Sequence, residues 1–409
     1  MKIDTILGQQ QDAHDRGPLL LAAVQGIEGI SMPFAYDVTM YRHMEDGDID
    51  PTKMISTPVT IGMRGKTNEY TYRSGVFQTF QKAGTNEQNW EKGFQTDFRV
   101  FNARIVPAFK MLDYEIRYRV FEDKTVLEII QEVMEGFPKL INFQSYVSTG
   151  LLKSDDYKKI PYCVQFGETS LNFLSRLMAE FDIWYVFDHR QSDIKSSNET
   201  MVLGSSFALF QQCTRMDMDV VFSAPDTDEI GGFQRSFVPA RKRVWVSDFN
   251  MLNPAHVPRG SATTTGLYDM LPRETDPTSF EREIFPALLT DPSDSDDAMS
   301  EQAKSRVEDE EDGVFTVQGQ CKNPSFMAGR IFHIRNDKTE PNLGNTGVPA
   351  GNNYLITQMS FAAFENAYGH YFYQDVGNWL LSPLRWVWSL FRKESLQQAL
   401  YLDATAALA

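Results

Sequence analysis

The segment 161–189, PYCVQFGETSLNFLSRLMAEFDIWYVFDH, constrains the fold more than any other part of the chain. Tyr162, Val164 and Phe166 alternate with smaller or polar residues, which is the period of a strand with one buried face. The β-branched and aromatic run at 183–187 predicts a second strand that is mostly buried. We therefore expect two strands here, whose residues belong to the structural core.

A helix is predicted between these two strands. Glu168, Thr169 and Ser170 supply hydroxyl and carboxylate oxygens that can accept hydrogen bonds from the free N–H groups of a first helical turn. Apolar residues then follow at spacings of three and four, which places them on one face of a helix that ends at Asp182. This apolar stripe consists of Leu171, Leu174, Leu177, Met178 and Phe181. The segment thus reads as a β-α-β unit.

Length and charge narrow the classes of protein that the chain can belong to. A chain of 409 residues, 42% of them hydrophobic, holds two to four domains with sizeable cores. The formal net charge is −16. Binding to phosphate groups needs clustered Lys and Arg, so this charge argues against nucleic acid and anionic membrane as partners.

The three cysteines and the first residues bear on the compartment. Cys163, Cys213 and Cys321 lie far apart, form no C-x-x-C pair and are typical of small buried residues in a reducing cytoplasm. The opening MKIDTILGQQQDAHDRG lacks a basic segment that leads into an apolar one. We therefore expect no signal peptide, and any export must use another route.

The remaining pattern is mainly β. Strand-like alternation occurs at 33–41, 70–80, 98–105 and 114–120, and again at 201–203, 220–249, 314–334 and 354–361. Thr125 and Glu128 form a capping-box sequence before an apolar helical stripe that ends near Gly136. The expected fold class is α+β, mainly β, with β-barrel or sandwich regions on either side of a helical patch.

Three further segments are distinctive. The basic cluster at 241–243 precedes an apolar strand and reads as a solvated strand end, or as a group paired with an acidic neighbour. The acidic stretch 290–313 reads as a loop around a solvated helix at 300–312.

The tail from 376 carries three tryptophans, and Pro383 and Arg385 interrupt it. It is too short for a membrane span of about 20 residues. We expect two helices around Pro383, buried against this chain or a sister subunit. An interfacial membrane helix with Arg385, Arg392 and Lys393 on its polar face is the less favoured alternative.

Catalytic and metal-binding patterns are missing from the sequence. It contains no H-E-x-x-H motif, P-loop, G-x-G-x-x-G motif or G-x-S-x-G elbow, and its six histidines show no metal-ligand spacing. The segment 46–50 begins like a calcium loop, but Pro51 and Thr57 stand where Gly and Glu are required, and 226–231 fails likewise at Phe237. We predict no catalytic residue, no cofactor and no metal ligand.

Two smaller features of the sequence resemble functional sites. Asp188 and His189 could form an acid/base pair, but no nucleophile accompanies them, so we interpret them as loop residues at a strand end. The triplet that begins at Asn198 is a glycosylation sequon, which a cytosolic chain would not use.

Several motifs, in their order, resemble one family: the VgrG spike proteins of type VI secretion and the related hub proteins of contractile phage tails. The matching segments are 31–38, 119–130, 161–189, 244–254, 326–332 and 354–357. The resemblance spans most of residues 5–370, and 161–189 is its most specific part.

The resemblance implies two related β-barrel domains joined by α/β elements. The domains expected from it are a first barrel at 1–120, an α/β connection at 121–219, and a second barrel at 220–370 with an insertion at about 255–312. A Trp-rich helical tail at 371–409 follows. The family continues into further β domains and a needle, whose short repeats this sequence lacks, so the chain is expected to be a fragment or a truncated variant.

The implied function is that of a structural hub, not an enzyme. The family forms a homotrimer that presents a pseudo-sixfold ring to the Hcp tube and is ejected during contraction. Baseplate subunits, an effector or its adaptor, and the PAAR tip are the other implied partners. The implied location is the bacterial cytoplasm before firing, and the target cell or medium afterwards. A phage or tailocin baseplate hub is the alternative, and a cell-wall hydrolase with a carboxylate pair is a third possibility.

Overall fold

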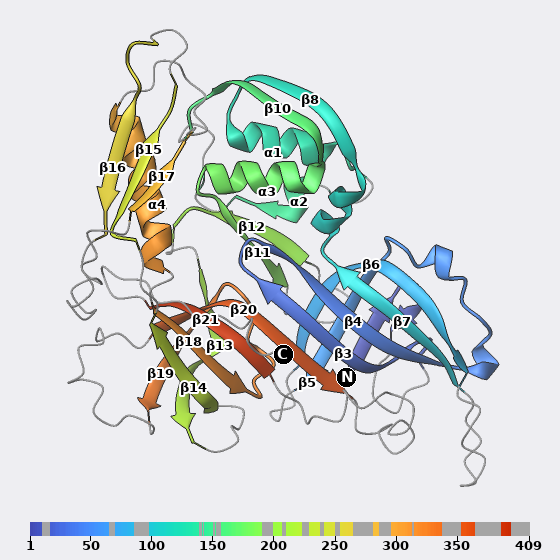
Figure 1. Cartoon of the computed structure of the whole chain (residues 1–409). Helices are drawn as coiled ribbons and strands as arrows, with labels where there is room; N and C mark the ends of the chain where they lie inside the picture. The colour runs from blue at the N-terminus through green and yellow to red at the C-terminus, as the bar shows by residue number, and fades with distance from the viewer. Residues whose placement is uncertain are drawn as a thin grey trace.

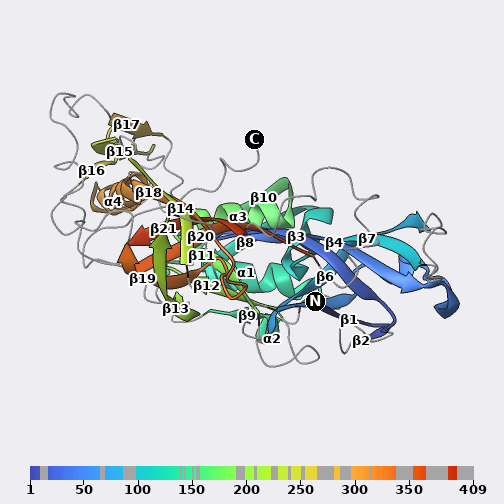
Figure 2. The same cartoon turned by 90° about the horizontal axis from the view of Figure 1, so that it is seen from below.

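The chain folds into two β-barrel units that are joined by α/β elements, with a small additional module at one margin (Figures 1 and 2). The computed structural model describes residues 1–9, 17–64, 70–85, 98–138, 141, 143–149, 152, 157–189, 199–206, 210–222, 229–237, 241–249, 254–264, 281–285, 296–312, 315–337, 353–364 and 386–393. The predicted fold class is therefore confirmed: α+β, mainly β.

The first barrel unit is built from antiparallel strands in the order β3-β4-β7-β6-β5-β1-β2. The strands are β1 (Lys2–Thr5), β2 (Gly8–Gln9), β3 (Leu20–Gly29), β4 (Met32–His43), β5 (Pro58–Arg64), β6 (Tyr70–Thr85) and β7 (Phe98–Val106). The alternation expected at 33–41 is visible in β4, where Tyr36, Val38 and Met40 are buried in the core. Short 3-10 helices, Met44–Asp46 and Pro51–Lys53, follow β4, and a third, Ala108–Tyr114, leads out of the unit.

The connecting part contains the helices that the sequence predicted. Its elements are β8 (Ile116–Lys124), α1 (Val126–Glu135), α2 (Phe143–Tyr146), β9 (Val147–Ser148), β10 (Ile160–Thr169), α3 (Ser170–Glu180), β11 (Trp184–His189) and β12 (Glu199–Gly204). The capping box of α1 is confirmed, because Thr125 N–H donates to Glu128 Oε2 at 2.8 Å and Glu128 N–H donates back to Thr125 Oγ1. Thr169 caps α3 by accepting from Asn172 N–H at 3.1 Å.

The two strands of the β-α-β unit belong to different sheets. Strand β10 pairs with β8 to form a two-stranded antiparallel ribbon, whereas β11 pairs with β12. The expectation for β10 was also wrong in one respect. Tyr162 and Phe166 are 60% and 78% exposed, and the polar Gln165 between them is fully buried. The strand period was predicted correctly, but the side of β10 that is buried within this chain is the other one.

The second barrel unit is a closed ring of six strands in the order β19-β13-β14-β18-β21-β20, with β20 pairing back to β19. The strands are β13 (Gln211–Val221), β14 (Glu229–Phe237), β18 (Phe315–Cys321), β19 (Arg330–Asp337), β20 (Asn353–Phe364) and β21 (Trp386–Lys393). Strand β20 also pairs with β3 of the first unit, from Gln358 opposite Gly29 to Phe364 opposite Ala23. One hydrogen-bonded sheet therefore runs through both barrels.

The prediction of a helical tail was wrong for residues 386–393, which form strand β21. Residues 386–393 pair with β18 and β20, which gives the aromatic and β-branched run a ladder on both sides. The flanking parts of the predicted tail, 371–385 and 394–409, lie outside the described residues.

The additional module consists of β15 (Arg243–Ser247), β16 (Arg259–Thr263), β17 (Glu281–Ile284) and α4 (Asp296–Asp312). Helix α4 covers one face of this three-stranded sheet, and both contribute to a separate small core of Val244, Val246, Met299, Ala303 and Val307. The helix expected in the acidic stretch is thus present, but it begins earlier and one side of it is buried. The basic cluster that precedes β15 is partly paired, because Arg243 contacts Glu281 at 3.4 Å.

A single hydrophobic core extends from the first barrel through α1 and α3 into the second barrel. Figure 1 shows the ribbon of β8 and β10 lying over α1 and α3, on the side away from β11 and β12. Among the described helices, none has the length and apolar character that crossing a membrane requires. The domain boundaries given above stay a prediction.

Candidate functional site: a buried charged junction

The most unusual chemistry of the described residues lies where the two barrels and the α/β elements meet. Adjacent residues of a strand point to opposite sides, so Asp188 and His189 at the end of β11 are directed apart. Asp188 forms an ion pair with Arg330 at the start of β19, and His189 is buried. The two residues belong to β11, so their interpretation as loop residues was wrong, and because they are directed apart they do not form an acid/base pair with each other.

Arg73 and Glu28 form the centre of this junction. The exposed fractions of their side chains are 0% and 6%, and Arg73 Nε donates to Glu28 Oε1 at 2.5 Å. The other guanidinium nitrogens of Arg73 donate to the carbonyl oxygens of Pro324 and Phe326, at 3.3 and 2.7 Å. The charge of Arg73, on β6 of the first barrel, is therefore neutralised by Glu28 of β3. Its remaining hydrogen bonds go to the loop between β18 and β19 of the second barrel.

The Glu28 carboxylate has two further hydrogen-bond donors. Tyr36 O–H donates to Oε1 at 2.9 Å, and Ala328 N–H donates to Oε2 at 3.3 Å. Burial alone raises the pKa of a carboxyl group, but the positive charge of Arg73 and these hydrogen bonds outweigh it, so the pKa of Glu28 lies below its usual value. Burial beside the ionised Glu28 raises the pKa of Tyr36 well above 10. Glu28 is ionised and Tyr36 is neutral at neutral pH.

His189 joins this network as a neutral side chain. Ser74 N–H donates to its Nδ1 at 3.1 Å, so the ring carries its proton on Nε2, which faces Tyr36 Oη at 3.3 Å. Burial lowers the pKa of His189 to about 4, even though the Glu28 charge opposes the shift. One chain of hydrogen bonds thus runs from β6 through His189 of β11 and Tyr36 of β4 to Glu28 of β3.

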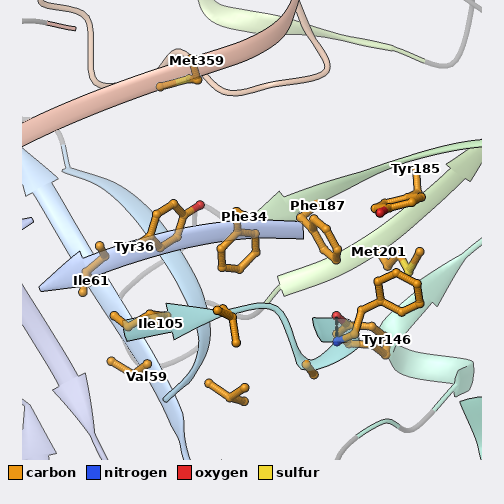
Figure 3. Close-up of a cluster of buried hydrophobic side chains, with 14 of the residues drawn as sticks. Phe34, Tyr36, Val59, Ile61, Ile105, Tyr146, Tyr185, Phe187, Met201 and Met359 are labelled. Carbon is orange, nitrogen blue, oxygen red and sulfur yellow. Dashed lines mark hydrogen bonds between the residues drawn. The ribbon is translucent and has the colours of Figure 1, made fainter. Parts of the chain in front are cut away.

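Aromatic packing reinforces the same junction (Figure 3). Phe34 stacks on Tyr36 with ring centroids 4.5 Å apart and meets Phe187 edge-on at 5.2 Å. Phe187 in turn contacts Tyr185 at 5.8 Å. Gly329, in the loop between β18 and β19, has a φ of +77° and lies against β11. A Cβ at this position would be 2.7 Å from Val186 Cγ1.

A second buried carboxyl group lies at the start of β12. Glu199 Oε1 accepts from Ala108 N–H at 2.6 Å, and the Tyr146 hydroxyl also forms a hydrogen bond with this carboxyl group. Burial raises the pKa of Glu199 to about 8, although the bond from Ala108 favours the ionised form. Glu199 is therefore mostly a neutral carboxylic acid at pH 7, and it holds the first turn of the 3-10 helix at Ala108–Tyr114.

This arrangement is suited to holding modules together, because a reactant cannot reach it. Arg73, Glu28, Tyr36 and His189 are all buried, and each makes the hydrogen bonds given above. Removing one partner of a buried ion pair costs about 3–5 kcal/mol, since the other charge then stays buried without compensation. The junction thus opposes separation of the modules.

The metal-site expectations can be compared with the described part of the chain. It contains no group of three or more Cys, His, Asp or Glu side chains placed to hold a metal ion. In the calcium-like segment, Asp48 pairs with Lys82 at 2.6 Å, and Asp50 caps the 3-10 helix Pro51–Lys53 by accepting from Thr52 N–H. Residues 226–228 and Asn198, the first residue of the sequon, lie outside the described residues.

The sequence patterns did not point to Glu28, Arg73 or Tyr36 as a group. Tyr36 and Arg73 were part of predicted strand segments, Glu28 lies outside them, and the partners of all three lie in distant segments of the chain. One local signal was present: Glu28 and Arg73 are single charges inside otherwise apolar or aromatic strand segments. Such a charge is rarely buried without a partner.

Comparisons with known proteins show which family has this architecture. The model of the phage tail baseplate hub (GPD) family matches residues 27–367. Two type VI secretion system spike proteins of Pseudomonas aeruginosa are similar: VgrG1b is 24% identical over 192 residues, and VgrG5 is 26% identical over 262 residues. The matches cover 47% and 60% of this chain but 22% and 29% of those proteins, so the chain spans well under half of their length.

Solved structures show the same fold. A type VI secretion component of E. coli, described as similar to bacteriophage tail proteins, matches with a TM-score of 0.60 and 14% identity, over 99% of this chain and 80% of that one. A tail protein of Neisseria meningitidis matches with a TM-score of 0.56 and 10% identity, over 97% of both chains. The predicted resemblance is confirmed, and the chain belongs to the phage tail baseplate hub family.

Proposed function

We propose that this chain is the structural hub that joins the tube of a type VI secretion machine to its spike. Membership of the baseplate hub family and the similarity to two VgrG proteins support the proposal. The observation that carries it is the joining of the two barrels, by the β3–β20 ladder and by the buried pair of Arg73 and Glu28. A part that transmits force needs its modules fixed relative to one another.

The proposed assembly is a ring of three copies. Each copy contributes two barrel units, so three copies present six similar units around one axis. Such a ring matches a sixfold tube of Hcp subunits on one side and a threefold needle on the other. Shape and symmetry do this work, and the proposed role requires no catalytic group.

The proposed partners and location follow from this role. The hub contacts Hcp and the baseplate subunits, while an effector or its adaptor and the PAAR tip bind the spike that continues from it. It resides in the bacterial cytoplasm before contraction and is ejected with the spike afterwards. Neither nucleic acid nor membrane belongs to this set, in keeping with the net charge of −16.

The test is the mass of the full chain and its binding to Hcp rings. Light scattering should give the mass of three copies, and the trimer should co-sediment with Hcp hexamers. A protein that stays monomeric at all concentrations, or a trimer that ignores Hcp, would contradict the proposal. Release of peptidoglycan fragments that is lost in a single Asp or Glu variant would instead support the hydrolase reading.

A hub of a phage or tailocin is the second candidate. It is favoured by the Neisseria tail protein, which matches over 97% of both chains, whereas the VgrG relatives extend well beyond the matched part. Replacing Hcp by a phage tail-tube protein in the sedimentation assay separates the two. Binding to the phage tube protein alone would favour this second candidate.

A further inference from the structure

The ribbon of β8 and β10 exposes an apolar surface of unusual extent for a single chain. We call it the apolar ribbon face, and it consists of Ile116, Tyr118, Val120, Tyr162, Val164 and Phe166. Five of these side chains are between 52% and 78% exposed, and Val164 is half-buried. Contiguous large apolar side chains at this exposure mark a site where another molecule binds.

The opposite side of the ribbon explains why the apolar side faces outward. Gln165 is fully buried and donates through Nε2 to the carbonyl oxygen of Glu168 at 3.0 Å. Phe121 stacks on Phe173 of α3 with ring centroids 5.6 Å apart. Gln165 Nε2 also donates to Ser170 Oγ at 3.4 Å, so the inner side contacts α3 through both polar and aromatic groups. The ribbon cannot turn over without losing these contacts, so the apolar side must be covered by something else.

The apolar ribbon face is held in place before any partner arrives. Tyr118 and Phe166 lie opposite each other in the ladder and meet edge-on at 5.2 Å. Gly167, with φ of +64°, gives the Tyr118 ring room, because a Cβ there would lie 2.9 Å from the hydroxyl oxygen. Rigid aromatic side chains of this kind act as anchors in interfaces, since few rotamers are lost on binding.

Charge indicates what covers this face. The chain carries a net charge of −16, so two copies repel one another over most of their surface. The six residues of the apolar ribbon face carry no charge. Two acidic copies can therefore meet here at little electrostatic cost.

The same chain carries a second apolar surface that can receive the ribbon. Phe249, Val257 and Phe285 are 53%, 50% and 60% exposed, and we call them the module tip. The register pairs Ser247 at the end of β15 with Arg259 at the start of β16, and the parallel strand β17 ends beside β15. All three residues therefore lie at one end of the three-stranded sheet.

Each of the two surfaces has a charged residue at its edge. Glu122 follows Val120 on the same side of β8 and is exposed, and it lies opposite Tyr162 in the ladder. Arg259 at the module tip pairs with Glu283 of β17 at 3.0 Å and keeps about half of its side chain exposed (52%). Figure 1 shows the module at the margin of the molecule, where a neighbouring copy can reach it.

We propose that the apolar ribbon face of one copy docks onto the module tip of the next. The contact is heterologous, and three copies that repeat it close into a ring when each copy is rotated by a third of a turn relative to the previous one. The inference rests on the proposed function, because it takes the partner to be a second copy in the hub. It adds the two surfaces that meet.

The first test is assembly of a ribbon variant. Tyr118→Glu combined with Phe166→Glu places two charges on the apolar ribbon face and removes no buried contact. The melting temperature of the monomer should therefore stay close to that of the wild type. We expect the concentration needed for trimer formation to rise by about 100-fold or more, as the loss of two interface anchors implies. The matched control is Phe222→Glu, at a side chain 80% exposed outside both surfaces, which should assemble as the wild type does.

The outcomes separate the two levels of the proposal. A wild-type chain that never assembles would overturn both the proposed function and this contact. A wild-type trimer whose ribbon variant assembles equally well would overturn the contact alone.

The second test identifies the partner surface. A photoreactive amino acid in place of Phe166 should cross-link, in the full-length trimer, to 247–249, 254–259 or 281–285 of another copy. Cross-links that reach a different surface of the copy, the same chain, or only Hcp in a mixture would overturn the proposed contact. The variant with the photoreactive group at position 222 is the control, and it should not cross-link to any of these segments.

Discussion

Arg73 Nε donates a hydrogen bond to Glu28 Oε1 over 2.5 Å, at a point where β3 and β6 of the first barrel meet a loop of the second. The same guanidinium group donates to two carbonyl oxygens of that loop, at Pro324 and Phe326. A single side chain therefore links the two barrel units. Because its charge is buried, the linkage is costly to break, which is what a rigid hub requires.

The first prediction concerns this pair. Arg73→Met should lower the free energy of unfolding by about 3–5 kcal/mol, because Glu28 would remain buried without its counter-charge. The matched control is Arg104→Met, which breaks the exposed pair with Asp37 on the same barrel and should cost about 1 kcal/mol or less. Urea unfolding of the three proteins measures both effects. Equal losses in the two variants would contradict the account of the junction.

The second prediction concerns the pH dependence from His189. Its pKa is about 4 in the folded chain and about 6.5 when unfolded. As pH falls, the unfolded chain therefore binds the proton before the folded chain does. The contribution of His189 to the free energy of unfolding is fully present above pH 6.5 and is lost as pH falls from 6.5 to 4. The slope is at most about 1.4 kcal/mol per pH unit.

His189→Gln should remove this contribution, so its free energy of unfolding should change less between pH 7 and pH 5 than that of the wild type. His256→Gln, at a half-exposed side chain, is the control and should keep the wild-type slope. Urea unfolding at several pH values measures the slopes. A slope that is unchanged in His189→Gln would show that this histidine is not held neutral.

The third prediction has the opposite sign and concerns Glu199. Its pKa rises from 4.5 to about 8 on folding, so the folded chain holds the proton more tightly. The resulting stability is present below pH 4.5 and is lost as pH rises towards 8. The side chain in Glu199→Gln stays neutral at every pH. The free energy of unfolding of this variant, relative to that of the wild type, should therefore rise by about 1.4 kcal/mol per pH unit between pH 5 and pH 8. A difference between the two proteins that does not change with pH would contradict this assignment.

The fourth prediction contrasts two neighbouring residues of β10. Gln165→Ala should lower the stability of the single chain by about 1–3 kcal/mol, because the variant leaves buried hydrogen-bonding groups without a partner. Phe166→Ala should change it by about 0.5 kcal/mol or less, since the ring is mostly exposed. Thermal melts at a concentration where the chain is monomeric measure both. A larger loss in Phe166→Ala would mean that the ring packs within its own chain.

Much of the fold could be predicted from local pattern. The capping box of Thr125 and Glu128 and the apolar stripe of α3 depend on contacts within a few residues, and both are present as expected. The strand period of β10 was equally clear. Which side of β10 faces inward was not, because Tyr162 and Phe166 are as apolar as core residues and the pattern does not distinguish a core from an interface.

The junction was beyond sequence reasoning for a different reason. Glu28 and Arg73 lie 45 positions apart, and the loop that receives the guanidinium group lies more than 250 positions further along. That loop lies between β18 and β19 of the second barrel, which is joined to the first by the pairing of β3 with β20. The strand at 386–393 was missed similarly, because its preference for a ladder depends on β18 and β20, which are distant in sequence.

We propose that the two barrels are held in a fixed relative position and that three copies close into a ring. Electron cryo-microscopy of the full chain, viewed along its symmetry axis, tests it most directly. The account predicts class averages with six similar densities around the axis, and a three-dimensional map in which β3 and β20 are paired in every copy. Averages of single chains, or barrels that take variable positions relative to each other, would contradict it.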